Sequence, residues 1–128
     1  MAAIAEGSIG RALALAEGDG PAMAEQVARV MAAIPAGLKA QGVADAVARD
    51  EAAFSLFMDL LRQAIGKLVR QGARGAPDSH QARLLALRSI EGWGRVWQAL
   101  TQIQDETERF ALDRRQAVLA GLSLMAGT

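Results

Sequence analysis

The chain of 128 residues lacks cysteine and tyrosine, and its aromatic residues are limited to three Phe and two Trp. Without cysteine the chain has neither a disulfide bond nor a thiolate metal ligand, which fits a reducing compartment. No apolar run approaches the roughly 18 residues that a membrane-spanning helix needs. Apolar and polar residues do not alternate as they would in a half-buried strand. These absences exclude a disulfide scaffold and a membrane span within this chain, and they argue against a β-sheet.

An excess of charge of either sign is also missing. The chain carries 14 Lys and Arg against 14 Asp and Glu, so its net charge is zero. Proteins that bind nucleic acid or an anionic membrane surface need a basic surplus or stripe, so we expect neither partner. The first residues lack the pattern of a signal peptide, and we expect a cytoplasmic location. Ala2 to Ala5 are typical of a helix already under way, so we expect a piece of a longer protein.

The residues that are abundant favour helix. Hydrophobic residues make up 52% of the chain; Ala and Leu lead them, and Arg, Gln and Glu are frequent among the polar residues. All five have high helix propensity, and a chain of this length can bury one core without crosslinks. We therefore predict an all-α domain, a bundle of about five to six helices.

Glycine and proline divide the chain into the predicted helices. The first predicted helix starts near Ser8. The next four cover residues 21–33, 38–49, 50–71 and 80–110, and the last begins at Asp113. The helix over residues 50–71 has so broad an apolar surface that it should contact neighbours on several sides, at the centre of the bundle. Its narrow polar face holds a set of six residues: Asp59, Arg62, Gln63, Gly66, Lys67 and Arg70.

Local signals predict where these helices end and bend. Gly72 is a candidate for the residue that follows the central helix, because glycine tolerates the left-handed conformation found there. Asp78 or Ser79 can cap the helix that follows. Gly92 and Gly94 lie within that helix and predict a bend in it.

Few residues carry catalytic or metal-binding chemistry. His80 is the only histidine and has no Cys or Ser–Asp constellation near it, so we interpret it as a surface or capping residue. The acidic residues Asp105, Glu106 and Glu108 lack the Glu-x-x-His motifs of a metal site in a helical bundle, which favours a solvated helix face. We expect no catalytic residue, no metal site and no cofactor in this chain.

Two groups of residues have two interpretations each. The first is a basic set near the end of the central helix: Arg62, Lys67, Arg70 and Arg74. It could contact nucleic acid, but cations near a helix C-terminus also complement the helix dipole, which we favour. The second group is Trp93 and Trp97, four residues apart on one helix face. Such pairs are typical of core or interface anchors; the alternative is a ligand platform that includes Gln98.

Each end of the chain carries a short motif. The segment Glu6-Gly-Ser-Ile-Gly-Arg-Ala-Leu-Ala-Leu15 is similar to Gly-Ser-hydrophobic-Arg-x-Ala-Leu, which clamp-loader subunits of the AAA+ family carry near the end of their lid domain. The segment Phe110-Ala-Leu-Asp-Arg-Arg-Gln-Ala-Val-Leu119 is similar to a last-helix signature of the delta-prime subunits of bacterial DNA polymerase III, commonly Asn-Leu-Asp-Arg-Lys-Gln-Ala-Leu. The two motifs bracket nearly the whole chain.

The resemblance implies a division of the chain. Residues 1–18 would be a remnant of the AAA+ lid, with a degenerate sensor-2 region at Ser8, Gly10 and Arg11, and residues 19–128 would be the helical collar domain. In ATP-hydrolysing members an Arg in the place of Gly10 reaches the nucleotide phosphates, whereas here Arg11 falls one residue later. This departure implies a non-hydrolysing, delta-prime-like subunit. A collar of the ATPase (gamma/tau-like) subunit is the alternative.

The function that the resemblance implies is oligomerisation without catalysis. Five collars pack into a ring that holds the loader of the DNA polymerase III holoenzyme together during sliding-clamp loading. The partners would be the delta and gamma/tau-like subunits of the bacterial, nucleoid-associated replisome, and the isolated fragment could self-associate. The expected interface residues are Trp93, Trp97, Phe110, Leu124 and Met125. From the residues alone, a generic helical protein–protein interaction module and a small-molecule-binding bundle stay open.

Overall fold

The computed structural model describes residues 19–34 and 38–126, and every regular element in them is an α-helix. The helices are α3 (Asp19–Ala33), α4 (Ala40–Val47), α5 (Glu51–Ala73), α6 (Ser79–Leu87), α7 (Ile90–Phe110) and α8 (Arg114–Met125). The prediction of an all-α bundle of about five to six helices is confirmed. The helix predicted near Ser8 lies outside the described residues.

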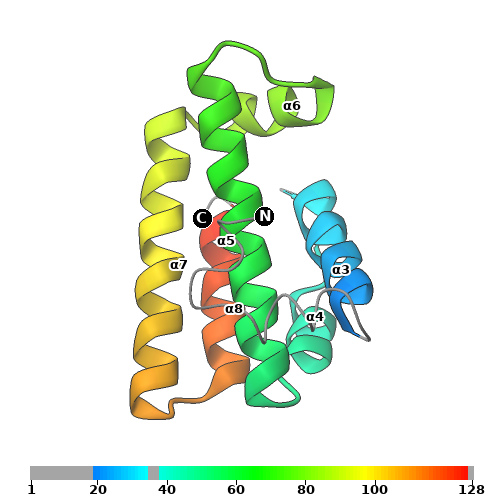
Figure 1. Ribbon diagram of the computed structural model, residues 1–128, viewed down its shortest axis with the longest axis vertical. Coiled ribbons are helices and arrows are strands. Elements are labelled where there is room, and N and C mark those ends of the chain that lie inside the picture. Colours follow the sequence, from blue (N-terminus) through cyan, green and yellow to red (C-terminus); the bar gives the residue numbers. More distant parts are fainter. Residues whose placement is uncertain (1–18, 35–37, 127–128) are drawn as a thin grey trace, which may run out of the picture.

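The long helix α5 is central, as the breadth of its apolar surface predicts. It packs against α7 and α3, while α8 packs against α7 and α4. Figure 1 shows α5 in green through the middle of the bundle, with α7 on one side, α3 and α4 on the other, and α6 across the top. The residues that α5 buries are Ala53, Phe54, Leu56, Phe57, Met58, Leu61, Ile65 and Leu68.

The largest buried side chains come from α5 and α7. Trp93, Phe54 and Phe57 have no exposed surface, and full burial of a side chain of this kind contributes about 1.5–3 kcal/mol. The indole Nε1 of Trp93 donates a hydrogen bond to the carbonyl of Leu84 at 3.0 Å, so its polar group is satisfied inside the core. The same bond attaches α7 to α6.

Residues 80–110 form two helices, and the chain breaks at Arg88 and Ser89 rather than bending near Gly92 and Gly94. Ser89 has an extended backbone, and its hydroxyl accepts from the N–H of Gly92 at 3.0 Å. It therefore caps α7. Gly92 instead allows the Arg88 side chain to pack closely against the backbone of α7, because a Cβ at Gly92 would lie 2.5 Å from Cγ of Arg88.

The end of α5 also differs from the prediction. The helix continues through Gly72 to Ala73, and the residue in the left-handed region is Gly75, with φ of 72°. Gly72 lies inside the helix, where a Cβ would come within 3.0 Å of the Leu85 side chain. Gly72 is therefore a packing residue between α5 and α6, and the helix-ending role falls to Gly75.

Capping side chains also account for the starts of α6 and α8. Asp78 accepts from the N–H of Gln81 at 2.8 Å, and the Gln81 side chain accepts from the N–H of Asp78 at 3.0 Å, which completes a capping box for α6. Asp113 accepts from the N–H of Gln116 at 3.1 Å at the start of α8. Lys39 makes no such bond before α4, and that helix is shorter than predicted.

Candidate functional site

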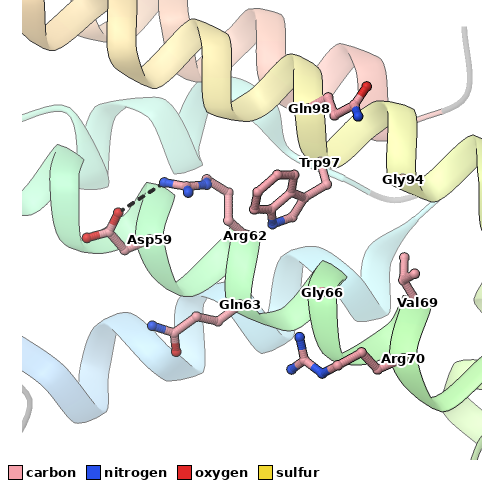
Figure 2. Close-up of a pocket in the computed structure, with 9 residues that line it drawn as sticks. All are labelled: Asp59, Arg62, Gln63, Gly66, Val69, Arg70, Gly94, Trp97 and Gln98. Carbon is pink, nitrogen blue, oxygen red and sulfur yellow. Dashed lines mark hydrogen bonds and ion pairs between the residues drawn. The ribbon is translucent and has the colours of Figure 1, made fainter. Parts of the chain in front are cut away.

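Trp97 lies in an open groove between α5 and α7, drawn in Figure 2. Its volume is about 640 Å³. The residues that line it are Asp59, Arg62, Gln63, Gly66, Val69, Arg70, Gly94, Trp97 and Gln98. We call it the Trp97 groove. With the exception of Lys67, the polar face predicted for residues 50–71 lines it.

Helical spacing explains why these residues meet. On α5 the lining residues recur every three or four positions and so share one face, and on α7 Gly94 lies three and four residues before Trp97 and Gln98. Two glycines, Gly66 and Gly94, contribute no side chain to the groove. A Cβ on Gly94 would meet nothing within 4 Å, and a Cβ on Gly66 would lie 3.3 Å from Nη1 of Arg70.

A polar network beside the groove holds Arg62 in place over Trp97. The Arg62 guanidinium carbon lies 5.3 Å from the Trp97 ring centroid, within the range of a cation–π contact. Nη1 of Arg62 donates to Oε1 of Gln104 at 2.8 Å and lies 3.5 Å from Oδ1 of Asp59. The charge of Arg62 is therefore already paired inside the protein.

Gln104 is the centre of this network. It is only 5% exposed, and its amide nitrogen donates to Asp59 at 2.9 Å and to Glu108 at 3.0 Å. Ser55 donates to the same Glu108 oxygen at 2.6 Å. Because α5 supplies Ser55 and Asp59 and α7 supplies Gln104 and Glu108, the network fixes how the two helices sit against each other.

The structure separates the five expected interface residues. Trp93 and Met125 are 0% and 1% exposed, so their side chains belong to the core of this fold. Trp97 and Leu124 are partly exposed, and Phe110 is 62% exposed. Thirteen residues of helix place Phe110 about 20 Å along the axis from Trp97. Trp97 and Phe110 therefore belong to different surfaces.

The other singled-out residues lie apart from the Trp97 groove. His80 is exposed at the rim of a second groove of about 450 Å³, which α3, α5 and α6 line and to which Lys67 also contributes. Asp105 pairs with Arg109 at 3.0 Å on the surface of α7, and Arg74 is exposed. Within residues 19–34 and 38–126, no group of three His, Cys, Asp or Glu side chains is placed to hold a metal ion. Ser8, Gly10 and Arg11 lie outside the described residues.

The sequence indicated the parts of this groove but not their combination. Trp97 was paired with Gln98, and Arg62, Gly66 and Arg70 were placed on one face of α5, yet the two arginines were interpreted, with Lys67 and Arg74, as a complement to the helix dipole. The available signal was Gly66, a glycine in the interior of a helix, where it costs about 1 kcal/mol relative to Ala. Such a glycine is typical of a close approach or an open surface.

The comparisons with known proteins identify no relative. No protein-family model matches the chain, and no curated protein or solved structure matches it significantly. None of the described helices is long and apolar enough to cross a membrane.

Proposed function

We propose that this chain is the C-terminal oligomerisation domain of a clamp-loader subunit, delta-prime-like, which helps to hold the pentameric loader together during sliding-clamp loading. Its partners are the delta and gamma/tau-like subunits, and the domain acts by binding them and not by catalysis. The site of action is in the cytoplasm, at the replisome. The two terminal sequence motifs support the identity of the complex, and the surface of the domain supports the binding role.

The observation that carries the binding role is the Trp97 groove. A partly exposed indole lies in an open groove between two helices, beside two arginines. Tryptophan and arginine are enriched among the residues that dominate binding energy in protein interfaces. An open groove between two helices fits a helix or loop of another protein.

A second surface lies at the corner between α7 and α8. Phe110 is 62% exposed and Leu112 is 50% exposed, and both belong to the segment that resembles the delta-prime signature. Ala111 between them adopts a left-handed φ of 52°, which turns the chain sharply from α7 into α8. A ring needs two different faces on each subunit, and this corner and the Trp97 groove supply a pair.

The direct test is size-exclusion chromatography with light scattering, on the chain alone and mixed with full-length delta and gamma/tau-like subunits of the same organism. We expect a new peak of mixed stoichiometry. Trp97→Ala should keep the helical circular dichroism spectrum and weaken assembly by more than about 1 kcal/mol. Leu87→Ala, which removes an exposed apolar side chain (46% exposed) on α6, is the matched control.

The contrary result is equally clear. If no mixed species forms well above ~10 μM, a level that populates interfaces worth about −7 kcal/mol, the clamp-loader assignment fails. The chain is then a helical interaction module with another partner. If Trp97→Ala lowers the melting temperature and leaves assembly unchanged, Trp97 is a core residue and the groove is not the contact surface.

A further inference from the structure

Arg70 differs from Arg62, the other arginine of the Trp97 groove. Arg62 is paired with Asp59 and Gln104. Among the described residues Arg70 has no ion pair and no hydrogen-bond acceptor for its side chain, although its Nη1 lies 3.3 Å from the point where a Gly66 Cβ would be. Figure 2 shows this guanidinium folded back along α5 below Gly66. In the described part of the chain, the groove therefore holds one paired cation, Arg62, and one exposed cation without an ionic partner, Arg70.

A second donor lies at the same point. Nε1 of Trp97 is 3.9 Å from the position of a Gly66 Cβ, and Figure 2 shows the indole nitrogen turned toward α5. This N–H has no acceptor in the described part of the chain, in contrast to the buried N–H of Trp93, which bonds to Leu84. An indole N–H and a guanidinium thus lie on the same side of Gly66.

Arg70 is exposed, so water hydrates its guanidinium in the free chain, and the chemistry of the two donors defines which group of a partner can replace that water. A guanidinium presents several N–H donors in a planar fork that matches the two oxygens of a carboxylate, and charge-assisted bonds of this kind form at about 2.7–2.9 Å. A carboxylate beside Gly66 can accept from Arg70 with one oxygen and from Trp97 with the other. Its negative charge would also balance the cation that the groove leaves unpaired.

We propose that the Trp97 groove binds an acidic side chain of a partner protein, with Arg70 and the Trp97 indole N–H as the two donors. The rest of the partner segment lies over Gly94, where the structure leaves open space, and an apolar residue of that segment contacts the Trp97 ring. This inference rests on the proposed assembly function and specifies its chemistry: the partner subunit contributes an Asp or Glu at the contact.

The test uses the mixed complex of the wild-type chain with full-length delta and gamma/tau-like subunits, with affinity measured by titration. We expect Arg70→Glu to weaken binding at least tenfold, because it places a like charge against the incoming carboxylate. Arg74→Glu is the matched control, since it makes the same charge change one turn further along, outside the groove. It should leave the affinity within about twofold.

Three further variants separate the donors from the shape of the groove. Trp97→Phe keeps an aromatic ring and removes the N–H, and we expect a severalfold loss of affinity. Gly94→Leu fills the open space and should weaken binding at least tenfold. Gly42→Leu adds the same side chain at another open helical glycine, on α4, and should not change binding. Circular dichroism melts of every variant show that the fold is retained.

Each outcome decides one question. If the wild-type complex forms and Arg70→Glu binds no worse than Arg74→Glu, the carboxylate contact is wrong while the proposed function stands. If the wild-type chain forms no mixed complex, the proposed function fails and this inference fails with it. Titration of the ¹⁵N-labelled chain with sodium acetate, followed at the Trp97 indole signal, tests a small-molecule site. Saturation below about 1 mM, where binding is worth more than about 4 kcal/mol, would overturn the protein partner.

Discussion

The guanidinium of Arg88 lies 4.8 Å from the centroid of the Trp93 ring, and its Nη2 donates to the carbonyl of Leu124 at 2.9 Å. One side chain at the break between α6 and α7 thus covers the largest aromatic residue of the core and binds the last turn of α8. Nη1 also lies 3.5 Å from the carbonyl of Met125. Helix C-termini leave carbonyls without intrahelical donors. A cation there donates hydrogen bonds to these carbonyls and also complements the helix dipole.

The contact between Arg88 and Gly92 predicts that Gly92→Ala destabilises the protein. A Cβ at this position would lie 2.5 Å from Cγ of Arg88, so Arg88 would have to leave its place over Trp93. We expect the free energy of unfolding to fall by about 1–3 kcal/mol, even though Ala has a higher helix propensity than Gly. Gly94→Ala is the matched control: its Cβ enters open space, and we expect a gain of up to about 1 kcal/mol. Urea unfolding followed by circular dichroism measures both, and equal gains would contradict the close approach.

Arg83 predicts a local effect on α3. Its Nη2 donates to the carbonyl of Met31 at 2.9 Å and its Nη1 donates to that of Ile34, so it caps the C-terminus of α3 from α6. Arg83→Met keeps the aliphatic part and removes both donors. We expect the free energy of unfolding to fall by about 1–3 kcal/mol and amide hydrogen exchange in the last turn of α3 to become faster. Arg95→Met, at an exposed position of α7, should leave both unchanged; equal exchange in the two variants would exclude the cap.

Gln104 predicts coupling between α5 and α7. Gln104→Leu keeps the volume but removes the acceptor of Arg62 and the donor to Asp59 and Glu108. Loss of such bonds at a buried position costs about 1–3 kcal/mol. Gln102→Leu, on the exposed side of α7, should stay within about 0.5 kcal/mol of the wild type. In a double-mutant cycle with Arg62→Met, an interaction energy below about 0.5 kcal/mol would show that the network does not hold Arg62.

Substitution of Phe110 should weaken assembly without changing the stability of the fold. Because 62% of its surface is exposed, Phe110→Ser should leave the free energy of unfolding within about 0.5 kcal/mol of the wild type. If the corner between α7 and α8 is a contact surface, the same change should weaken the mixed complex at least tenfold. Titration calorimetry with the loader subunits measures this. Wild-type affinity in the Phe110→Ser variant would remove this corner from the assembly.

Apolar spacing was enough to predict an all-α bundle and the central place of α5. Phe54, Leu61 and Leu68 are each seven residues apart and all lie in the core, as a helical period requires. The break before α7 could not be predicted in this way, because apolar residues keep their spacing across it. The capping hydroxyl of Ser89 competes with helix continuation there.

The two Trp residues show why the groove itself stayed hidden. Trp93 and Trp97 are four residues apart and share one face of α7, so their spacing gives them the same expected environment. The structure buries Trp93 completely and leaves Trp97 partly exposed. Trp93 is covered by Arg88 and bonded to Leu84 of α6, whereas Trp97 lies beside Gly66, which has no side chain to cover it. Only tertiary packing distinguishes them.

The two arginines of the α6 region have a mechanical consequence. Arg83 holds the end of α3 and Arg88 holds the end of α8. Only the last four residues of the nine-residue helix α6 lie between these two arginines, because Arg88 is its C-cap. A pull on α3 is therefore transmitted through α6 to α8 without passing along the chain between them. The first and last described helices of the domain should yield together under force, as one cooperative unit.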